Sequence, residues 1–290
     1  MSEGGVLPVD KPEGPTSHDM VARARGILGT RRIGHTGTLD PFATGLLLLC
    51  VGPSTRLSEY LTGLPKRYLA RMRLGVVTDT DDRTGAVIAT HDTTRLDPDR
   101  VRQALAAQVG TISQRPPIYS AKKISGKRAH ALAREGQEVA PDPVRVTIHD
   151  IQIREMELPE VVFEVSCGSG TYIRAIARDV GEVLGVGGHL LELRRTAIGV
   201  HEVADAVSLE GDADRDAIER AMLSPARALR HLPAVGLTVE QVEAVRNGRR
   251  ILASDAPTGP EPISLLAPEG ALVAIAEHRD GWLQPRKVIG

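Results

Sequence analysis

Arg32-Ile-Gly-His-Thr-Gly-Thr-Leu-Asp-Pro-Phe-Ala-Thr-Gly-Leu-Leu47 is the most informative stretch of the chain, and residues 34–45 within it show neither a helical nor a strand period. Three glycines in those twelve residues predict an irregular loop whose backbone bends sharply or approaches another group closely. A phosphate cradle would use such glycines, but Gly34-x-x-Gly37 lacks the spacing and the following Lys-Ser/Thr of a Walker loop. The alternative is that Asp40 only forms a local turn before Pro41.

The composition is that of an ordinary globular protein, with 290 residues of which 41% are hydrophobic and 25% charged. It excludes disordered, collagen-like and coiled-coil proteins. The longest apolar run, residues 46–51, is far shorter than the ~20 residues that cross a bilayer. No basic segment followed by an apolar one marks a signal peptide, and two cysteines are too few for a disulfide framework or a structural zinc site. We therefore expect a cytoplasmic protein.

The basic residues are unusual because 30 of the 36 are arginines, although the net charge is only -1. Arginine suits bidentate contact with phosphate and stacking on rings. The basic residues fall in small clusters at 23/25, 31/32, 67/71/73, 122/123/127/128, 194/195 and 249/250. This pattern favours a nucleic-acid partner, although a genome of skewed base composition also enriches arginine.

Helical and strand periods alternate along the chain. A first helix is predicted after Thr16-Ser17 and is ended by Gly29, and further helices are predicted from 97 onward, over a short stretch ending at 136, and over 171–184. Strands are predicted over 46–51, 67–76, 144–153 and 161–165. In the second of these strands, Tyr68, Ala70, Met72, Leu74 and Val76 share one face. Several strands follow one another too closely for βαβ crossovers, so we expect a mixed α+β fold with a largely antiparallel sheet.

The chain changes character after residue 232, where Gly and Pro interrupt short apolar pieces at 263–266, 272–276 and 286–289. We predict a domain at 1–232 and a small β-rich domain at 233–290.

The loop at residues 34–45 resembles the signature of the TruB-type tRNA pseudouridine synthases, and further motifs follow in that family's order over roughly residues 6–200. They are Asp10-Lys-Pro-Glu-Gly14, Lys66-Arg-Tyr-Leu-Ala70, Pro117-Ile-Tyr-Ser-Ala-Lys-Lys123, Cys167-Gly-Ser-Gly-Thr-Tyr-Ile-Arg174 and His189-Leu-Leu-Glu-Leu-Arg-Arg-Thr196. The resemblance implies a pseudouridine-synthase fold with an RNA-gripping insertion at about 115–142. Leu237-Thr-Val-Glu240 and Val245-Arg-Asn-Gly-Arg-Arg-Ile251 resemble the opening of a PUA domain, which implies a PUA-like RNA-binding domain at 233–290.

The implied activity is that of an isomerase that converts uridine at position 55, in the TΨC arm of tRNA, to pseudouridine. The reaction breaks the C1′–N1 bond and joins C5 to C1′. Because no atom or electron is gained, we expect no cofactor and no metal, and the nine histidines lack zinc-like spacing. The resemblance places the required carboxylate at Asp40. Attack at C1′, attack at C6 and proton removal at C2′ all remain open for it.

The resemblance also assigns four residues to the uracil pocket. Arg174 matches the arginine that pairs with the catalytic aspartate, which would keep that carboxylate ionised and oriented. Tyr68 would stack on the uracil, and Tyr172 and Leu193 would line the pocket. The alternatives on the residues alone are a surface arginine near a helix start for Arg174 and ordinary core side chains for the other three.

Contacts with RNA are implied for His35, Lys11 and the insertion. His35 would enter the RNA loop near the place vacated by the flipped base, since an enzyme acting on a nucleobase must remove it from its stack. The alternative is an ordinary polar surface residue of the loop. Lys11 would lie near the active site and support the fold or the RNA. Arg115, Lys122, Lys123, Lys127, Arg128 and Arg134 would lie along phosphates, the alternative being a solvated basic helix.

Two rival functions remain open at this point. A carboxylate glycosidase shares attack at an anomeric carbon, but it normally needs two carboxylates and the motifs supply one. A protein that only binds or folds tRNA would not need Asp40, although tRNA folding also fits as an additional role of the synthase. We expect a monomer that binds tRNA and no membrane.

Overall fold

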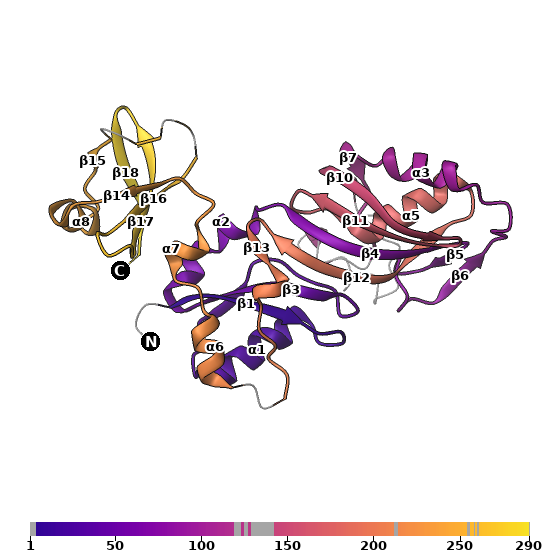
Figure 1. Cartoon of the computed structure of the whole chain (residues 1–290), viewed down its shortest axis with the longest axis horizontal. Coiled ribbons are helices and arrows are strands. Elements are labelled where there is room, and N and C mark those ends of the chain that lie inside the picture. The colour runs from indigo at the N-terminus through magenta and orange to yellow at the C-terminus, as the bar shows by residue number, and fades with distance from the viewer. Residues whose placement is uncertain are drawn as a thin grey trace. The chain divides into compact units, whose positions relative to one another are not determined.

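The computed structural model describes residues 4–118, 123–124, 127–128, 142–211, 214–253, 256–257, 259 and 261–289. The chain divides into two compact units. The first unit comprises Met1–Pro41, Gly45–Thr62 and Gly199–Gly290, and the second comprises Phe42–Thr44 and Gly63–Ile198. Figure 1 labels most of the elements of both. None of the helices in the described part of the chain is long and apolar enough to cross a membrane.

The N-terminal part of the first unit packs one helix against a small antiparallel sheet. Strand β3 (Thr44–Val51) pairs with β1 (Gly5–Lys11) and with β2 (Ile33–His35). Helix α1 (Ser17–Leu28) buries Met20, Val21, Ala24 and Leu28 against these strands. It begins at Thr16, which forms a capping box with Asp19, and ends at Gly29, whose φ of 65° favours glycine. The prediction of this helix is confirmed.

Short elements complete this part of the unit. They are η1 (Gly52–Leu57), α2 (Ser58–Thr62), β13 (His201–Glu202), η2 (Val203–Asp205), α6 (Arg215–Ala221) and α7 (Pro225–Ala228).

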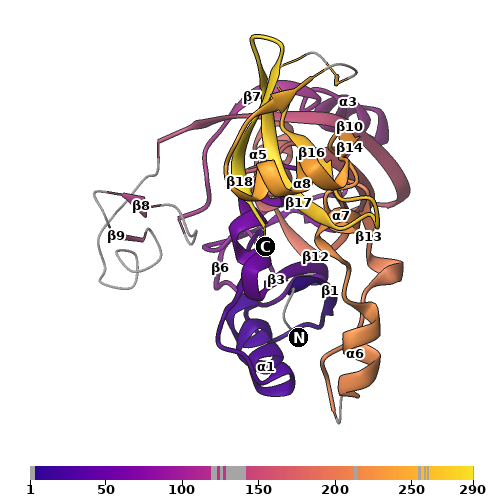
Figure 2. The same cartoon turned by 90° about the vertical axis from the view of Figure 1, so that its left-hand side faces the viewer.

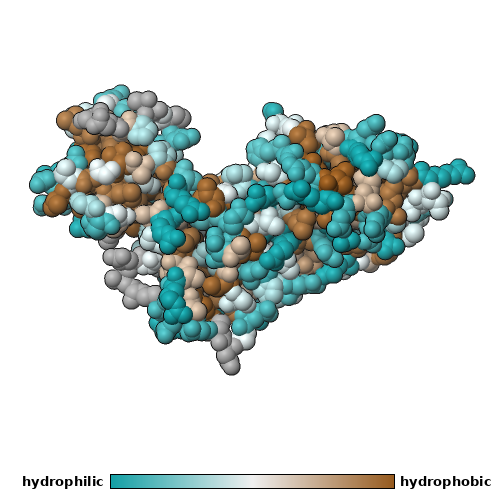
Figure 3. Space-filling view, in the orientation of Figure 1, coloured by the Kyte–Doolittle hydropathy of each residue, from teal (hydrophilic) through white to brown (hydrophobic). Residues whose placement is uncertain are grey.

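The C-terminal segment of the first unit has its own five-stranded sheet and its own apolar core. The strand order is β14 (Ala234–Gly236), β16 (Ile263–Leu266), β17 (Leu272–Arg279), β18 (Trp282–Val288) and β15 (Ile251–Leu252). Helix α8 (Val239–Arg246), which the sequence analysis did not predict, packs beside this sheet (Figure 2). On the face drawn in Figure 3, apolar side chains gather densely over these strands. The β-rich character is confirmed, and the boundary at residue 233 stays a prediction.

The second unit is built on an antiparallel sheet in the order β12 (Gly188–Ile198), β4 (Lys66–Leu74), β11 (Glu160–Cys167), β10 (Val144–Glu157) and β7 (Gly110–Gln114). Helices α3 (Pro98–Ala106) and α5 (Ile173–Leu184) pack on each other and on this sheet (Figure 1). Strands β5 (Val76–Thr78) and β6 (Val87–Thr90) form a hairpin, and β8 (Lys123–Ile124) pairs with β9 (Lys127–Arg128). The expected α+β class with a largely antiparallel sheet is confirmed.

Three local predictions need correction. Val76 does not continue the buried face of β4, because Gly75, with φ at 89°, ends that strand and Val76 begins β5 half-buried. Helix α5 begins at Ile173 rather than at residue 171, because Tyr172 keeps an extended backbone as its N-cap. The expected loop is shorter at both ends, since residues 34–35 belong to β2 and residues 44–45 to β3. The short helix predicted to end at residue 136 lies outside the described residues.

Candidate active site

The loop that carries Asp40 is tied to the rest of the first unit on both sides of the aspartate. On one side, Ser17 Oγ accepts a hydrogen bond from Leu39 N at 2.9 Å and donates one to Leu39 O at 3.2 Å. On the other side, Gly14 N donates to Pro41 O at 2.8 Å. Asp40 itself is half-buried. These bonds fix the backbone on both sides of Asp40, so the loop needs little further ordering when a substrate arrives.

Lys11 reinforces the second of these anchors. Its side chain is fully buried, and Nζ donates to Pro12 O at 2.7 Å, to Pro15 O at 2.8 Å and to Pro41 O at 3.3 Å. These contacts join the end of β1 to the Asp40 loop. The structure therefore gives Lys11 a role in supporting the loop.

His35 ends β2 and is oriented by local contacts. Its Nδ1 accepts a hydrogen bond from Gly37 N at 3.3 Å, and its ring meets that of His18 edge-on with the ring centres 5.3 Å apart. The ring is half-buried. Its role toward RNA stays a prediction.

Arg174 is buried at the start of α5. Its Nη1 donates to Thr80 O at 2.8 Å and to Asp82 Oδ2 at 3.1 Å. Both side chains of this ion pair are about 95% shielded from solvent, with exposed fractions of 5% and 4%. The alternative interpretation of Arg174 as a surface arginine is therefore wrong.

Asp82 was missed by the sequence analysis, which assigned no role to it. Its second oxygen, Oδ1, accepts from Thr80 Oγ1, Thr84 N and Thr84 Oγ1, so the carboxylate that faces Arg174 is itself held in place. The only signal in the sequence is the density of Asp and Thr in this turn, which is common in ordinary turns as well.

Tyr68 and Leu193 lie on one face of the second unit's sheet. Leu193 on β12 is opposite Ala70 on β4, and Ala70 shares its face with Tyr68 two residues away. The exposed fraction is 8% for Tyr68 and 7% for Leu193, so packing within the core covers most of the surface of both side chains.

Tyr172, the N-cap of α5, is held through its backbone by a fully buried side chain that the sequence analysis also missed. Gln114 Oε1 accepts from Tyr172 N at 2.8 Å, and Gln114 Nε2 donates to Tyr172 O at 3.0 Å. The side chain of Tyr172 is half-buried. Gln114 thus fixes the residue that precedes α5 and Arg174.

The predicted site residues divide between the units: Lys11, His35 and Asp40 belong to the first, and Tyr68, Tyr172, Arg174 and Leu193 to the second. The side chains of Lys122, Lys123, Lys127, Arg128 and Arg134 lie outside the described residues. Within the part of the chain that is described, no group of three or more His, Cys, Asp or Glu is placed to hold a metal ion.

Lys66, the first residue of the Lys-Arg-Tyr motif, is also buried, and its Nζ donates to Leu64 O at 2.6 Å. Burial, reinforced by the charge of Arg195, lowers the pKa of this lysine to about 8. The charged form of Lys66 therefore lowers the stability of the folded protein.

Two family models match the chain in succession. Residues 25–173 match the N-terminal domain of the TruB family pseudouridylate synthases, and residues 174–230 match the C-terminal domain of tRNA pseudouridylate synthase B. The second match begins at residue 174, inside the segment 1–232 that the sequence analysis predicted as one domain.

Curated relatives and solved structures agree with these matches. The tRNA pseudouridine synthase B of Thermobifida fusca is 43% identical over 97% of both chains, and that of Corynebacterium jeikeium is 52% identical over 72% of this chain and 71% of its own. A chain in the crystal structure of a Cbf5-Nop10-Gar1 complex superposes with a TM-score of 0.75 at 26% identity, covering 99% of this chain and 85% of that one. The protein belongs to the TruB family of pseudouridylate synthases.

Proposed function

We propose that this protein isomerises uridine 55 in the TΨC arm of tRNA to pseudouridine, with Asp40 as the catalytic carboxylate. The observation that carries the proposal is the double anchoring of the Asp40 loop, through Ser17 on one side and Lys11 with Gly14 on the other. Curated relatives that match 97% of the chain are named tRNA pseudouridine synthase B, which supports tRNA as the substrate.

The chemistry that Asp40 has to perform is balanced within the nucleotide. The C1′–N1 bond breaks, the uracil turns, C5 bonds to C1′, and the proton leaving C5 is replaced by one gained at N1. An ionised carboxylate serves as a nucleophile at C1′ or C6, or as a base at C2′. Each route needs a carboxylate whose position is fixed before the uracil moves, which the anchored loop supplies.

The other predicted residues take supporting roles in this proposal. Arg174 keeps Asp40 ionised and oriented, and Tyr68 stacks on the uracil. Tyr172 and Leu193 close the pocket around the base. His35 enters the RNA loop at the place vacated by the flipped uridine, which lowers the few kcal/mol that unstacking costs.

The substitution Asp40→Asn tests the proposal, with Asp99→Asn as the matched control. Asp99 is an exposed aspartate at the start of α3, and its direct ion pair with the exposed Arg102, at 2.7 Å, contributes little to stability. Both variants are incubated with an unmodified tRNA transcript and with a transcript in which position 55 is cytidine, and pseudouridine is mapped chemically.

We expect wild-type protein and Asp99→Asn to modify position 55 of the first transcript alone. Asp40→Asn should bind tRNA within about threefold of wild type and form no pseudouridine, because an amide keeps the shape but is neither nucleophile nor base. Turnover by Asp40→Asn near the wild-type rate refutes the assignment. Tight binding without modification by the wild-type protein would instead indicate a tRNA-folding role.

A further inference from the structure

Two arginines one turn apart on α5 meet two consecutive aspartates of the turn between β5 and β6. Arg174 pairs with Asp82 at 3.1 Å, and Arg178 pairs with Asp81, Nη1 to Oδ2, at 2.9 Å. Residues four apart on a helix lie on the same side, so both arginines face this turn. The pair formed by Asp81 and Arg178 is also largely buried, with exposed fractions of 12% and 16%.

The backbone at Asp81 makes this double contact possible. Its φ is 59°, in the left-handed region that few residues other than glycine, asparagine and aspartate adopt. That conformation allows both consecutive carboxylates to reach α5. The same turn is bound to β12, since Leu190 N donates to Asp81 O at 3.0 Å and Arg83 N donates to Leu190 O at 2.8 Å. These two bonds hold the turn in place against β12.

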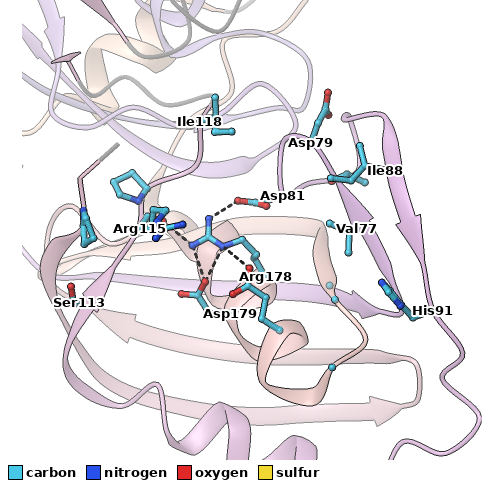
Figure 4. A pocket seen from close by; sticks show the side chains of 17 residues that line it. Val77, Asp79, Asp81, Ile88, His91, Ser113, Arg115, Ile118, Arg178 and Asp179 are labelled. Atoms are coloured by element: carbon cyan, nitrogen blue, oxygen red, sulfur yellow. Dashed lines mark hydrogen bonds and ion pairs between the residues drawn. The ribbon is translucent and has the colours of Figure 1, made fainter. Parts of the chain in front are cut away.

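Arg178 uses its guanidinium to join three parts of the second unit (Figure 4). Besides Asp81 in the turn, it binds its helix neighbour Asp179, Nη2 to Oδ1, at 2.8 Å. Its Nη2 also donates to Arg115 O at 2.8 Å, in the segment that follows β7. A lysine or a neutral side chain could not make this planar set of bonds.

The electrostatics of Asp81 agree with this arrangement. Burial raises the pKa of its carboxyl, while the charges of Arg178 and Arg174 both act to lower it. Asp81 is therefore within the field of both arginines, and removing Arg178 would leave a buried carboxylate that also attracts Arg174. Such a competitor would draw Arg174 away from Asp82.

We propose that Arg178 is a positioning residue for the pseudouridine synthase reaction: by binding Asp81, it fixes the turn in which Asp82 holds Arg174. The inference rests on the proposed function, because it assumes that Arg174 acts on the catalytic carboxylate. Arg178 does not touch the substrate in this scheme and acts only through the turn.

A cavity beside Arg178 allows the role of its guanidinium to be tested by chemical rescue. It has a volume of about 900 Å³ and is lined by Asp81, Arg178 and Asp179 together with apolar side chains such as Val77 and Ile88. Figure 4 shows the guanidinium of Arg178 between the two aspartates in this cavity. A small cation added to the solution can therefore occupy the place of a deleted guanidinium.

The experiment measures single-turnover rates at saturating enzyme for the full-length protein, with Arg178→Ala, Asp81→Asn and the control Arg102→Ala. Arg102 is an exposed arginine on α3 that also pairs with an aspartate. We expect Arg178→Ala to lower the saturated rate by about 10–50-fold, because small misplacements remote from the chemistry cost up to 100-fold. The tRNA dissociation constant should stay within about threefold, and guanidinium at about 50 mM should restore the rate at least fivefold. Arg102→Ala should keep the wild-type rate with and without guanidinium.

Several outcomes overturn the inference. A folded Arg178→Ala protein with an unchanged saturated rate does so, and so does a lowered rate that guanidinium leaves unchanged, which would assign Arg178 to stability alone. If Arg178→Ala fails to fold, Asp81→Asn decides, since it keeps the side-chain shape: a full rate refutes the inference, and a reduced rate with unchanged tRNA affinity supports it. Failure of the proposed function is distinguishable, because the wild-type protein would then form no pseudouridine.

Discussion

Replacement of Lys11 by methionine tests whether the buried ammonium holds the loop that carries Asp40, the proposed catalytic residue. Methionine has nearly the shape of lysine but donates no hydrogen bond. The contacts that the substitution removes include those to Pro12 O, Pro15 O and Pro41 O, at 2.7, 2.8 and 3.3 Å. The side chain is fully buried, so water does not replace the lost donor without local opening.

The expected cost follows from opposing contributions. Hydrogen bonds from a charged donor contribute ~1.5–3 kcal/mol each. Burial of an ammonium costs several kcal/mol, which the variant no longer pays. We expect a net loss of about 2–4 kcal/mol in the free energy of unfolding. Because Pro41 O keeps its bond from Gly14 N, the loop should stay formed but less fixed, and the saturated single-turnover rate should fall about tenfold, equivalent to ~1.4 kcal/mol.

Urea unfolding and single-turnover pseudouridine formation on a tRNA transcript measure the two effects of Lys11→Met. Arg23→Met, which removes an exposed arginine from α1, is the control for loss of a positive charge. It should change the unfolding free energy by no more than about 0.5 kcal/mol. The reasoning is refuted if Lys11→Met unfolds within about 0.5 kcal/mol of wild type and keeps its full rate.

Three further predictions concern packing and titration. A Cβ at Gly181 would lie 2.2 Å from the backbone carbon of Gly187, so Gly181→Ala should lower the unfolding free energy by about 2–3 kcal/mol; Gly26→Ala, with open space around it, should raise it by about 0.5–1 kcal/mol in the same urea assay. Lys66→Met should stabilise the protein by about 1–3 kcal/mol at pH 7. The pKa of Lys66 is lowered from 10.5 to about 8, so the penalty is full below pH 8 and disappears as pH rises toward 10.5; a difference between variant and wild type that is constant from pH 7 to 10 contradicts this. Burial raises the pKa of the Cys50 thiol to about 12 and that of the Cys167 thiol to about 11. Iodoacetamide at pH 8 should therefore modify neither cysteine in the folded protein and both in urea, which mass spectrometry measures.

Local pattern was enough to predict much of the fold. The helical spacing of apolar residues, with Thr16 before and Gly29 after them, predicted α1 because capping and amphipathic periodicity act within one element. Alternation predicted the buried face of β4 from Tyr68 to Leu74 for the same reason. The pattern failed at Val76, where the positive φ of Gly75 turned the chain out of the strand. Helix α8 was missed because its eight residues are too few for a clear period.

The sequence by itself determined to which family the chain belongs and in which loop the proposed catalytic aspartate lies, because those conclusions depend on residue identities in short stretches. Only the tertiary structure decided what holds that machinery in place. Arg174 is 92 residues from Asp82, and Gln114 is 58 from Tyr172, so neither partner could be inferred from spacing. Hydrogen bonds reach about 3 Å, and the docking of α5 and the turn against the sheet determines which side chains come that close.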